Sequence, residues 1–264
     1  MVFAVEIPGG ESLYTIYNTF LEGHLKVSPE EVQQLSSNLI RAALSLHTGV
    51  ASTFRKTAIN FHYEFNIRHL ARVFQGLLGS RPEQFKEPDK MVRLWLHESE
   101  RVYGDILVSY EHMAQYAKLS QSVGKKLFAN VNIDRFFAKE NPDLLLYNHF
   151  ANGDLQDKLY NEVTQIDVLS DVLNSALAEY NETNAAMPLV LFTDAMKHIC
   201  RVTRVINNPS GHALLVGVGG MGKQSLARLA TFVNGYSAFQ VVITARYGVN
   251  DLKADLQIMY KKAG

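Results

Sequence analysis

The amino-acid sequence predicts an α/β region in its second half and an all-helical region before it. Two short apolar runs, 213–216 and 238–244, have the composition of buried strands, and a helical pattern follows each of them. In the first 110 residues, apolar side chains recur instead at steps of three and four, as on the buried face of a helix. We therefore expect a helical part over 1–115, a connector over 116–165 and an α/β part over 166–264.

Local start and stop signals place the individual helices. Ser28, followed by Pro and Glu31, indicates a helix start with a capping box, and Asn66 caps another helix that ends at Gly79. Residues 61–65 alternate and fit either a short strand or an extended connector. The expected helices span 12–24, 32–46, 67–78, 91–103 with Trp95 as its largest anchor, 167–180, 193–206, 225–232 and 251–262, which Asp251 caps.

Composition argues against several kinds of partner. The chain has 26 Lys and Arg and 26 Asp and Glu in 264 residues, so net charge gives no reason to expect a nucleic acid. No apolar run approaches the ~20 residues that cross a bilayer, and no secretory signal begins the chain, so we expect a soluble intracellular protein. The single cysteine, Cys200, excludes an internal disulfide and fits a small core residue. The nine histidines show no zinc-site spacing.

A glycine-dense turn joins the first expected strand to the helix after it. A glycine turn in this position lets backbone N–H groups face an anion, the helix N-terminus adds partial positive charge, and the lysine reaches terminal phosphates. The sequence therefore predicts a phosphate-binding loop, although a glycine turn that binds nothing remains the alternative. Its candidate residues are Gly217, Val218, Gly219, Gly220, Met221, Gly222, Lys223, Gln224 and Ser225.

The loop departs from the usual pattern at one position. In G-x-x-x-x-G-K-[ST], which begins here at Gly217, the last residue is Gln224 instead of a hydroxyl residue. That hydroxyl normally ligates magnesium. Ser225 is no simple replacement, because the next residue of a helix points about 100° away. We expect nucleotide binding and treat hydrolysis as a separate question. No acidic residue on a strand after Lys223 can position magnesium or water, so we expect no ATP turnover by this chain alone.

Two further patterns concern a possible magnesium site and the number of strands in the expected sheet. Residues 188–194 imitate the apolar strand and acid of a magnesium site, but such a strand normally follows the loop. Asp194 fits better in the first turn of the helix that contains Cys200, where the helix dipole favours it. A doubly wound sheet that starts near Leu214 needs further strands, so we expect the sequence to be cut at both ends.

Several motifs together resemble one family. The loop, its surroundings and the upstream helices look like axonemal dynein heavy chains, from the end of the third AAA+ module to the first part of the fourth. The resemblance covers nearly the whole chain, and Gln224 fits it, whereas Met221, His69 and Pro188 depart from it. The matching stretches are 7–13, 61–70, 94–103, 181–194, 217–229 and 247–253.

This resemblance implies a fold, ligands and additional site residues. The fold would be a helical AAA+ lid subdomain followed by a partial P-loop AAA+ large subdomain. The loop would hold ATP or ADP, with or without Mg²⁺, and Leu191 and Phe192 would flank the adenine. Arg68 matches the lid arginine that touches the nucleotide of the preceding module; the alternative is a surface ion pair.

The resemblance also implies a setting. It suggests a six-module ATPase ring that walks on microtubules, located in the cytoplasm, the cytoskeleton and the axoneme of a cilium or flagellum. Partners would be the other AAA+ modules of the same heavy chain and, through other parts of it, dynein intermediate and light chains and microtubules. Because the magnesium hydroxyl is absent, we expect a regulatory site. The rivals are a non-catalytic nucleotide-binding scaffold and, more weakly, an independent P-loop kinase.

Overall fold

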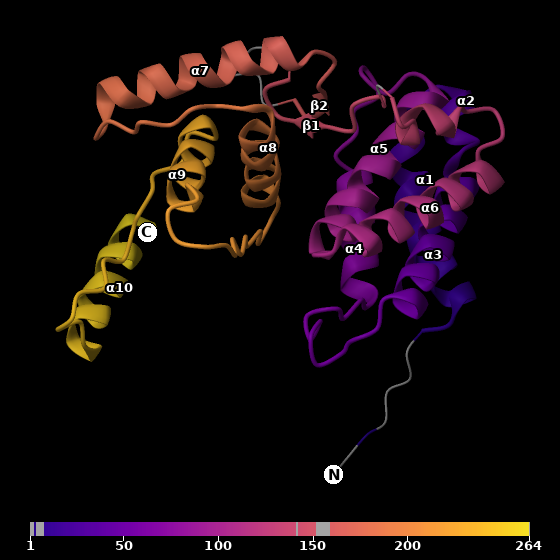
Figure 1. The fold of residues 1–264 in the computed structure, drawn as a ribbon. Helices are drawn as coiled ribbons and strands as arrows, with labels where there is room; N and C mark the ends of the chain where they lie inside the picture. The colour runs from indigo at the N-terminus through magenta and orange to yellow at the C-terminus, as the bar shows by residue number, and fades with distance from the viewer. Residues whose placement is uncertain (1–2, 4–7, 141, 152–158, 264) are drawn as a thin grey trace. The chain divides into compact units, whose positions relative to one another are not determined.

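The chain folds into two compact units, Met1–Ile166 and Asp167–Gly264 (Figure 1). The structure, a computed structural model, describes residues 3, 8–140, 142–151 and 159–263. Each unit is taken by itself below. None of the helices in these ranges is both long and apolar enough to cross a membrane.

The first unit is a helical bundle with one small two-stranded sheet. Strand β1 pairs antiparallel with β2, with Tyr147 opposite Glu162. The elements are α1 (Gly10–Leu25), α2 (Glu30–Gln33), α3 (Ser36–Thr53), α4 (Ile67–Leu77), α5 (Pro88–Val102), the 3₁₀ helix η1 (Gly104–Ile106), α6 (Tyr110–Leu127), η2 (Ile133–Phe137), β1 (Tyr147–Asn148) and β2 (Asn161–Glu162).

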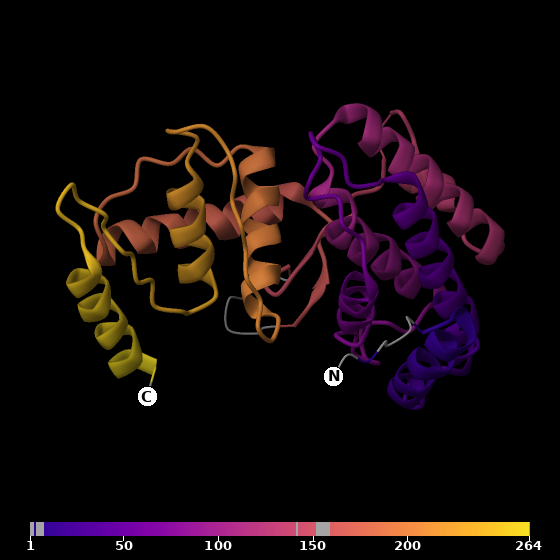
Figure 2. The same ribbon diagram turned by 90° about the horizontal axis from the view of Figure 1, so that it is seen from below.

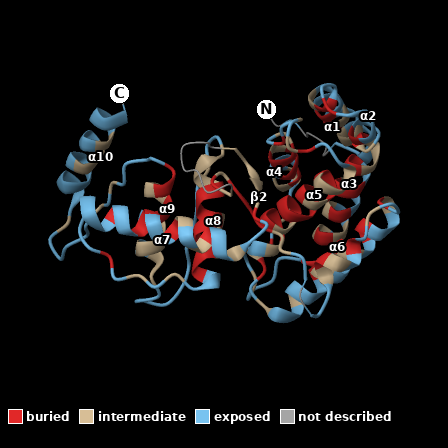
Figure 3. Cartoon of the chain, turned by 90° about the horizontal axis from the view of Figure 1, so that it is seen from above, coloured by how far each residue is buried: buried red, intermediate tan, exposed pale blue. Residues whose placement is uncertain are grey.

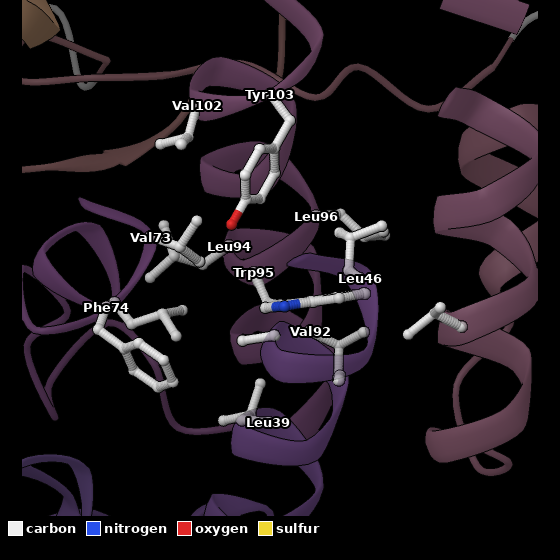
Figure 4. Close-up of a cluster of buried hydrophobic side chains, with 14 of the residues drawn as sticks. Leu39, Leu46, Val73, Phe74, Val92, Leu94, Trp95, Leu96, Val102 and Tyr103 are labelled. Atoms are coloured by element: carbon white, nitrogen blue, oxygen red, sulfur yellow. The ribbon is translucent and has the colours of Figure 1, made fainter. Parts of the chain in front are cut away.

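Helix α5 is the central element of this unit. Eight of its residues from Met91 to Ser99 are buried, so the helix is covered on nearly every side (Figure 3). Trp95 is fully buried and lies 5.3 Å from Phe128 between ring centroids. Side chains from α3 and α4 surround it, among them Leu39 and Val73 (Figure 4). Trp95 is thus the apolar anchor that the sequence predicts.

Arg93 of α5 binds the sheet segment. Its Nη1 donates to Glu162 Oε2 at 2.6 Å, and its Nη2 donates to the Leu144 carbonyl oxygen at 2.6 Å. Both side chains of the Arg93–Glu162 pair are only 15% exposed. One guanidinium therefore fixes the chain on both sides of the β1–β2 pair.

One turn further along α5, a buried carboxylate joins the sheet segment to α4. Glu98 is fully buried, and Tyr160 donates its hydroxyl to Glu98 Oε1 at 2.6 Å. The same hydroxyl lies 3.0 Å from His97 Nε2. On the α4 side, a Cβ built on Gly76 would lie 1.9 Å from Glu98 Oε2. Glycine at this position is what allows α4 and α5 to pack so closely.

Two expectations for this unit are corrected. Ser28 does not cap a long helix: Pro29 is the N-cap of α2, and a turn closed by the Leu35 N–H and the Val32 carbonyl separates α2 from α3. Residues 61–65 form no strand: 61 and 62 lie in a turn, and the rest of the segment connects this turn to α4.

Residues 116–165, expected as an irregular connector, contribute to this unit. Helix α6 continues to Leu127 and packs on α3. Its buried face consists of Tyr116, Ser120, Val123 and Gly124, at helical spacing. Serine and glycine on a buried face weaken the hydrophobic period, which is why the sequence pattern does not predict this helix.

The second unit contains four helices in its described part, as expected from the sequence. They are α7 (Ile166–Thr183), α8 (Thr193–Asn207), α9 (Lys223–Val233) and α10 (Val249–Ala263). Helices α8 and α9 lie side by side (Figure 1 and Figure 2). Their ends are joined by Asn207, which donates to Asn234 Oδ1 at 2.8 Å, and Tyr180 of α7 meets Phe232 of α9 edge to face at 5.4 Å.

The two strands expected in this unit are not formed in the structure. Residues 213–216 and 238–244 carry no strand assignment, and Leu214 and Ile243 are 88% and 79% exposed. A helix closes its own backbone hydrogen bonds, whereas a strand requires a neighbouring strand. No second strand lies beside either segment among the described residues, so their apolar side chains remain in solvent.

We predict opposite effects of alanine at two helical glycines. Gly76→Ala should lower the free energy of unfolding by about 1–3 kcal/mol, because its methyl group displaces the buried Glu98 carboxylate from Tyr160. Gly23→Ala on α1 should raise it by about 0.5–1 kcal/mol, because nothing lies within 4 Å of a Cβ there. Urea denaturation followed by circular dichroism measures both. Equal stability of the two variants would contradict the close α4–α5 packing.

Candidate nucleotide-binding site

The glycine-dense turn leads directly into α9, as the sequence predicts. Gly220 and Gly222 have φ angles of +81° and +74°, in the left-handed region that favours glycine. Gly222 is the N-cap of α9. Without a left-handed residue at this position, the chain would not turn from the loop into the helix at Lys223.

Lys223, the first residue of α9, turns its side chain back over the loop. Its Nζ donates to the carbonyl oxygens of Gly217 and Val218, both at 2.7 Å. An ammonium has three N–H donors, so these two bonds leave one donor for another acceptor. The positive charge is therefore held at the opening of the loop, next to the helix N-terminus.

The N-terminus of α9 supplies further donors. The first bond of the helix runs from the Leu226 N–H to the Gly222 carbonyl at 2.9 Å. The N–H groups before it have no partner within the helix, and the helix dipole places partial positive charge there. Together with Lys223, this arrangement suits the oxygen atoms of a phosphate group.

The side chains next to the loop are less suited to binding a magnesium ion. Gln224 is exposed at the second position of α9, where the usual pattern has a hydroxyl, and Ser225 is half-buried. Val218 and Met221 are 76% and 68% exposed on the loop. A site of three or more metal-binding side chains of His, Cys, Asp or Glu is absent from the described residues. The loop therefore offers a phosphate group the donors of Lys223 and of the α9 N-terminus, whereas Gln224 offers a metal only an amide oxygen.

The candidate adenine residues lie at the start of α8. Phe192 is its N-cap and is 63% exposed, and Leu191 is half-buried. Within the part of the chain that the structure describes, neither side chain has a ring contact or hydrogen bond to residues 217–225. Asp194 lies in the first turn of α8, 3.6 Å from Lys197, which confirms that position for it. Cys200 is buried in the same helix, as expected.

Arg68 lies in the first turn of α4, in the first unit. The Asn66 side chain accepts a hydrogen bond from the Arg68 N–H at 3.0 Å and so fixes the start of the helix. The Arg68 side chain is exposed, and in the described ranges it forms no ion pair. The alternative of a surface ion pair therefore finds no support in the structure.

Sequence reasoning missed a role of His69. Its Nδ1 accepts a hydrogen bond from the Asn66 N–H at 3.2 Å, which completes a capping box at the start of α4. The signal was present in the spacing, because Asn66 and His69 are the two ends of an N-cap–x–x–N3 pattern. Histidine is not among the usual residues at N3, so the spacing alone does not point to this role.

A tyrosine and two carboxylates fix the beginning of α10. The helix begins at Val249, two residues before the expected start at Asp251, so Asp251 lies inside its first turn, where its carboxylate accepts from the Gly248 N–H at 2.8 Å. The Tyr247 hydroxyl donates to Asp255 Oδ2 at 2.6 Å, and this bond raises the pKa of Tyr247 to about 12. The segment after the second apolar run is thus anchored locally.

Comparison with known proteins agrees with this geometry. Residues 39–138 match the AAA+ lid domain, and residues 187–264 match the P-loop containing dynein motor region D4. The chain is 56% identical over 264 residues to the dynein alpha chain of the flagellar outer arm of Chlamydomonas reinhardtii. It is 48% identical to dynein axonemal heavy chain 17 of Homo sapiens and 46% identical to the ciliary dynein beta chain of Tripneustes gratilla. The chain belongs to the axonemal dynein heavy chain family.

These matches extend over 99–100% of the chain. The chain spans about 6% of the length of each of these relatives. The dynein family fixes the fold class as a helical AAA+ lid followed by part of a P-loop AAA+ subdomain, as the sequence predicts. The loop, Lys223 and α9 all lie within the D4 match, and Arg68 lies within the lid match.

We predict that the loop tolerates alanine at Gly219 and not at Gly222. A non-glycine residue in the left-handed region costs about 1–2 kcal/mol, so Gly222→Ala should lower hydrogen-exchange protection of α9 about tenfold. Gly219→Ala should leave protection unchanged, because its φ is not left-handed and nothing lies within 4 Å of its Cβ. Hydrogen exchange, measured by mass spectrometry on peptides that cover 223–233, tests this difference between the two variants. An unaffected Gly222→Ala variant would refute the proposed strain.

Proposed function

We propose that this chain provides a nucleotide-binding site of a dynein motor, in which residues 217–225 hold the phosphates of ATP or ADP. The observation that supports this most is the position of Lys223. Its ammonium is held over the loop by two carbonyl oxygens, and left-handed Gly222 places it at the first turn of α9. Phosphate oxygens require this combination of a cation and free N–H groups.

The remaining site residues have supporting roles in this proposal. Leu191 and Phe192, at the start of α8, flank the adenine. Arg68, whose guanidinium is exposed at the start of α4, touches the nucleotide of the preceding module. The corresponding division of the chain is a lid over 1–115, a connector over 116–165 that packs on the lid through α6, and the P-loop part over 166–264.

We further propose that this site regulates and does not drive the motor. With Gln224 in place of a hydroxyl, the loop offers magnesium only an amide oxygen on a longer side chain. Mg²⁺, which supplies charge neutralisation for phosphates when it is bound, is then held weakly. A nucleotide bound in this way changes the conformation of its module without rapid hydrolysis.

The motor setting rests on the relatives, whose printed names include flagellar outer arm and ciliary dyneins. In this proposal the chain is part of a ring of AAA+ modules in a ciliary or flagellar axoneme. Its partners are the other modules of the same heavy chain, and intermediate chains, light chains and microtubules through other parts. The proposed locations of the motor also include the cytoplasm and the cytoskeleton.

The alternative function is a non-catalytic nucleotide-binding scaffold without a motor role. Gln224 fits this function too, because weak magnesium binding suits a nucleotide that stays bound permanently as well as one that regulates the motor. Substitution of Lys223 in an intact heavy chain distinguishes the two. A change in microtubule gliding velocity supports regulation of the motor, whereas unchanged gliding together with lost nucleotide binding supports the scaffold.

We predict that Lys223→Ala weakens nucleotide binding about ten- to hundredfold. A charge-assisted hydrogen bond contributes about 1.5–3 kcal/mol, and each 1.4 kcal/mol is tenfold in affinity. Titration of a fluorescent ADP analogue into the 264-residue chain measures the dissociation constant. The matched control is Lys253→Ala, which removes an exposed lysine on α10 and should leave affinity unchanged. Equal affinity of the wild-type protein and the Lys223 variant would exclude the loop as the site.

We predict that Gln224→Thr strengthens the magnesium dependence of nucleotide binding. The wild-type chain should bind the ADP analogue with similar affinity in magnesium and in chelator, because Gln224 holds the metal poorly. A threonine hydroxyl at this position should make the difference about tenfold, or about 1.4 kcal/mol. Ser225→Thr tests the neighbouring position and should change nothing. Strong magnesium dependence already present in the wild-type chain would contradict this prediction.

A further inference from the structure

The first turn of α4 is held by a capping box with an unusual member. Asn66 Oδ1 accepts from the Arg68 N–H at 3.0 Å, and His69 Nδ1 accepts from the Asn66 N–H at 3.2 Å. A glutamate or glutamine at this position accepts the hydrogen bond throughout the pH range around neutrality. A histidine nitrogen accepts only while it carries no proton, so this cap depends on the protonation of His69.

Protonation would also reverse the interaction on the other side of the same nitrogen. His69 Nδ1 lies 3.3 Å from Asn66 Oδ1. A protonated Nδ1 repels the Asn66 N–H and competes with the Arg68 N–H for that oxygen. The positive charge would then stand at a helix N-terminus, where the dipole already disfavours cations. Both bonds of the cap are therefore weakened by a single proton.

The surroundings of His69 disfavour the protonated form of its ring. Its ring is half-buried, lies 5.6 Å from Phe65 and stacks at 6.4 Å on Tyr103, the C-cap of α5. On α3, His47 shares this tyrosine, with 3.0 Å between His47 Nδ1 and the Tyr103 hydroxyl. Burial is the main cause that raises the pKa of Tyr103, so the phenol stays neutral.

Burial is the largest influence on the pKa of His69, and the charged groups around the ring act in opposite directions. Burial and then the Arg72 guanidinium on α4 lower the pKa of His69, while the Asn66 backbone and the Glu64 carboxylate in the preceding loop act against them. Burial and His69 itself lower the pKa of His47. The opened turn, in which His69 is hydrated, therefore binds a proton more readily than the capped turn. By linkage, acidification below about pH 6.5 favours the opened turn.

We propose that His69 makes the first turn of α4 a pH-sensitive cap, which is closed at neutral pH and opens in acid. The residue in this turn with an exposed cation is Arg68. Opening releases the Arg68 backbone N–H from Asn66, so the residue that carries this guanidinium is no longer held in an ordered helical turn. The cap itself needs no nucleotide; only the consequence for a nucleotide at Arg68 rests on the proposed function.

Hydrogen exchange of the 264-residue chain tests the cap by itself. Protection factors for 67–70, corrected for the intrinsic rate, should fall about five- to tenfold between pH 7.5 and pH 5.0, the amount that loss of an N-cap produces. The Cε1 proton shift of His69, followed over the same range, should titrate together with this loss. Protection in the α5 core around Trp95 should stay unchanged and serves as the internal reference.

Two variants decide whether His69 is responsible. His69→Gln places an acceptor at the same position at every pH, so protection of 67–70 should no longer depend on pH. His47→Gln should keep the loss, because the cap bonds do not involve His47. The proposal is overturned if the wild-type turn is equally protected at both pH values, if His69→Gln loses as much protection as wild type, or if His47→Gln abolishes the loss. Nucleotide affinity does not enter this result, so it is independent of the proposed function.

Discussion

Every buried backbone N–H and C=O group needs a hydrogen-bond partner, and this constraint accounts for the difference between the two units. The first unit meets it within itself, because its helices close their own bonds and β1 pairs with β2. In the second unit the helices also close their bonds, whereas 213–216 and 238–244 have no neighbouring strand among the described residues. Their apolar side chains, which a sheet would bury, remain largely exposed, as at Leu214 and Ile243.

In the first unit, apolar packing holds the helices together, and buried polar groups fix their positions relative to one another. The surroundings of Trp95 are apolar and fix α3, α4 and α5 as a bundle, but such packing tolerates small shifts in register. Arg93 and Glu98 remove that freedom, since each buried bond has a defined direction. Gly76 completes the arrangement, because only a residue without a side chain leaves room for the carboxylate. Helix α4, with Arg68 at its start, therefore has a fixed position on α5.

The sequence was sufficient where one segment determines its own structure and insufficient where several must cooperate. Strong apolar periodicity predicted α5, α8 and α9, and the glycines and Lys223 predicted the loop. Ser120 and Gly124 hid the buried face of α6 from a hydropathy pattern. The two strands were predicted from composition, but a strand also depends on a partner that composition does not reveal. The cap at His69 required knowledge of a side-chain direction, which spacing alone does not give.

Under the proposed function, the chain contributes to nucleotide sites at two points, the loop and Arg68. Lys223 and Arg68 both lie in the first turn of a helix, and in each case the residue before the helix fixes that turn: Gly222 by its left-handed backbone, Asn66 by its side chain. The first device is independent of pH, because no titrating group takes part in it. The second depends on the neutral form of His69. On the proposed assignment, phosphate binding at the loop would therefore persist in acid, while contact through the lid arginine would weaken.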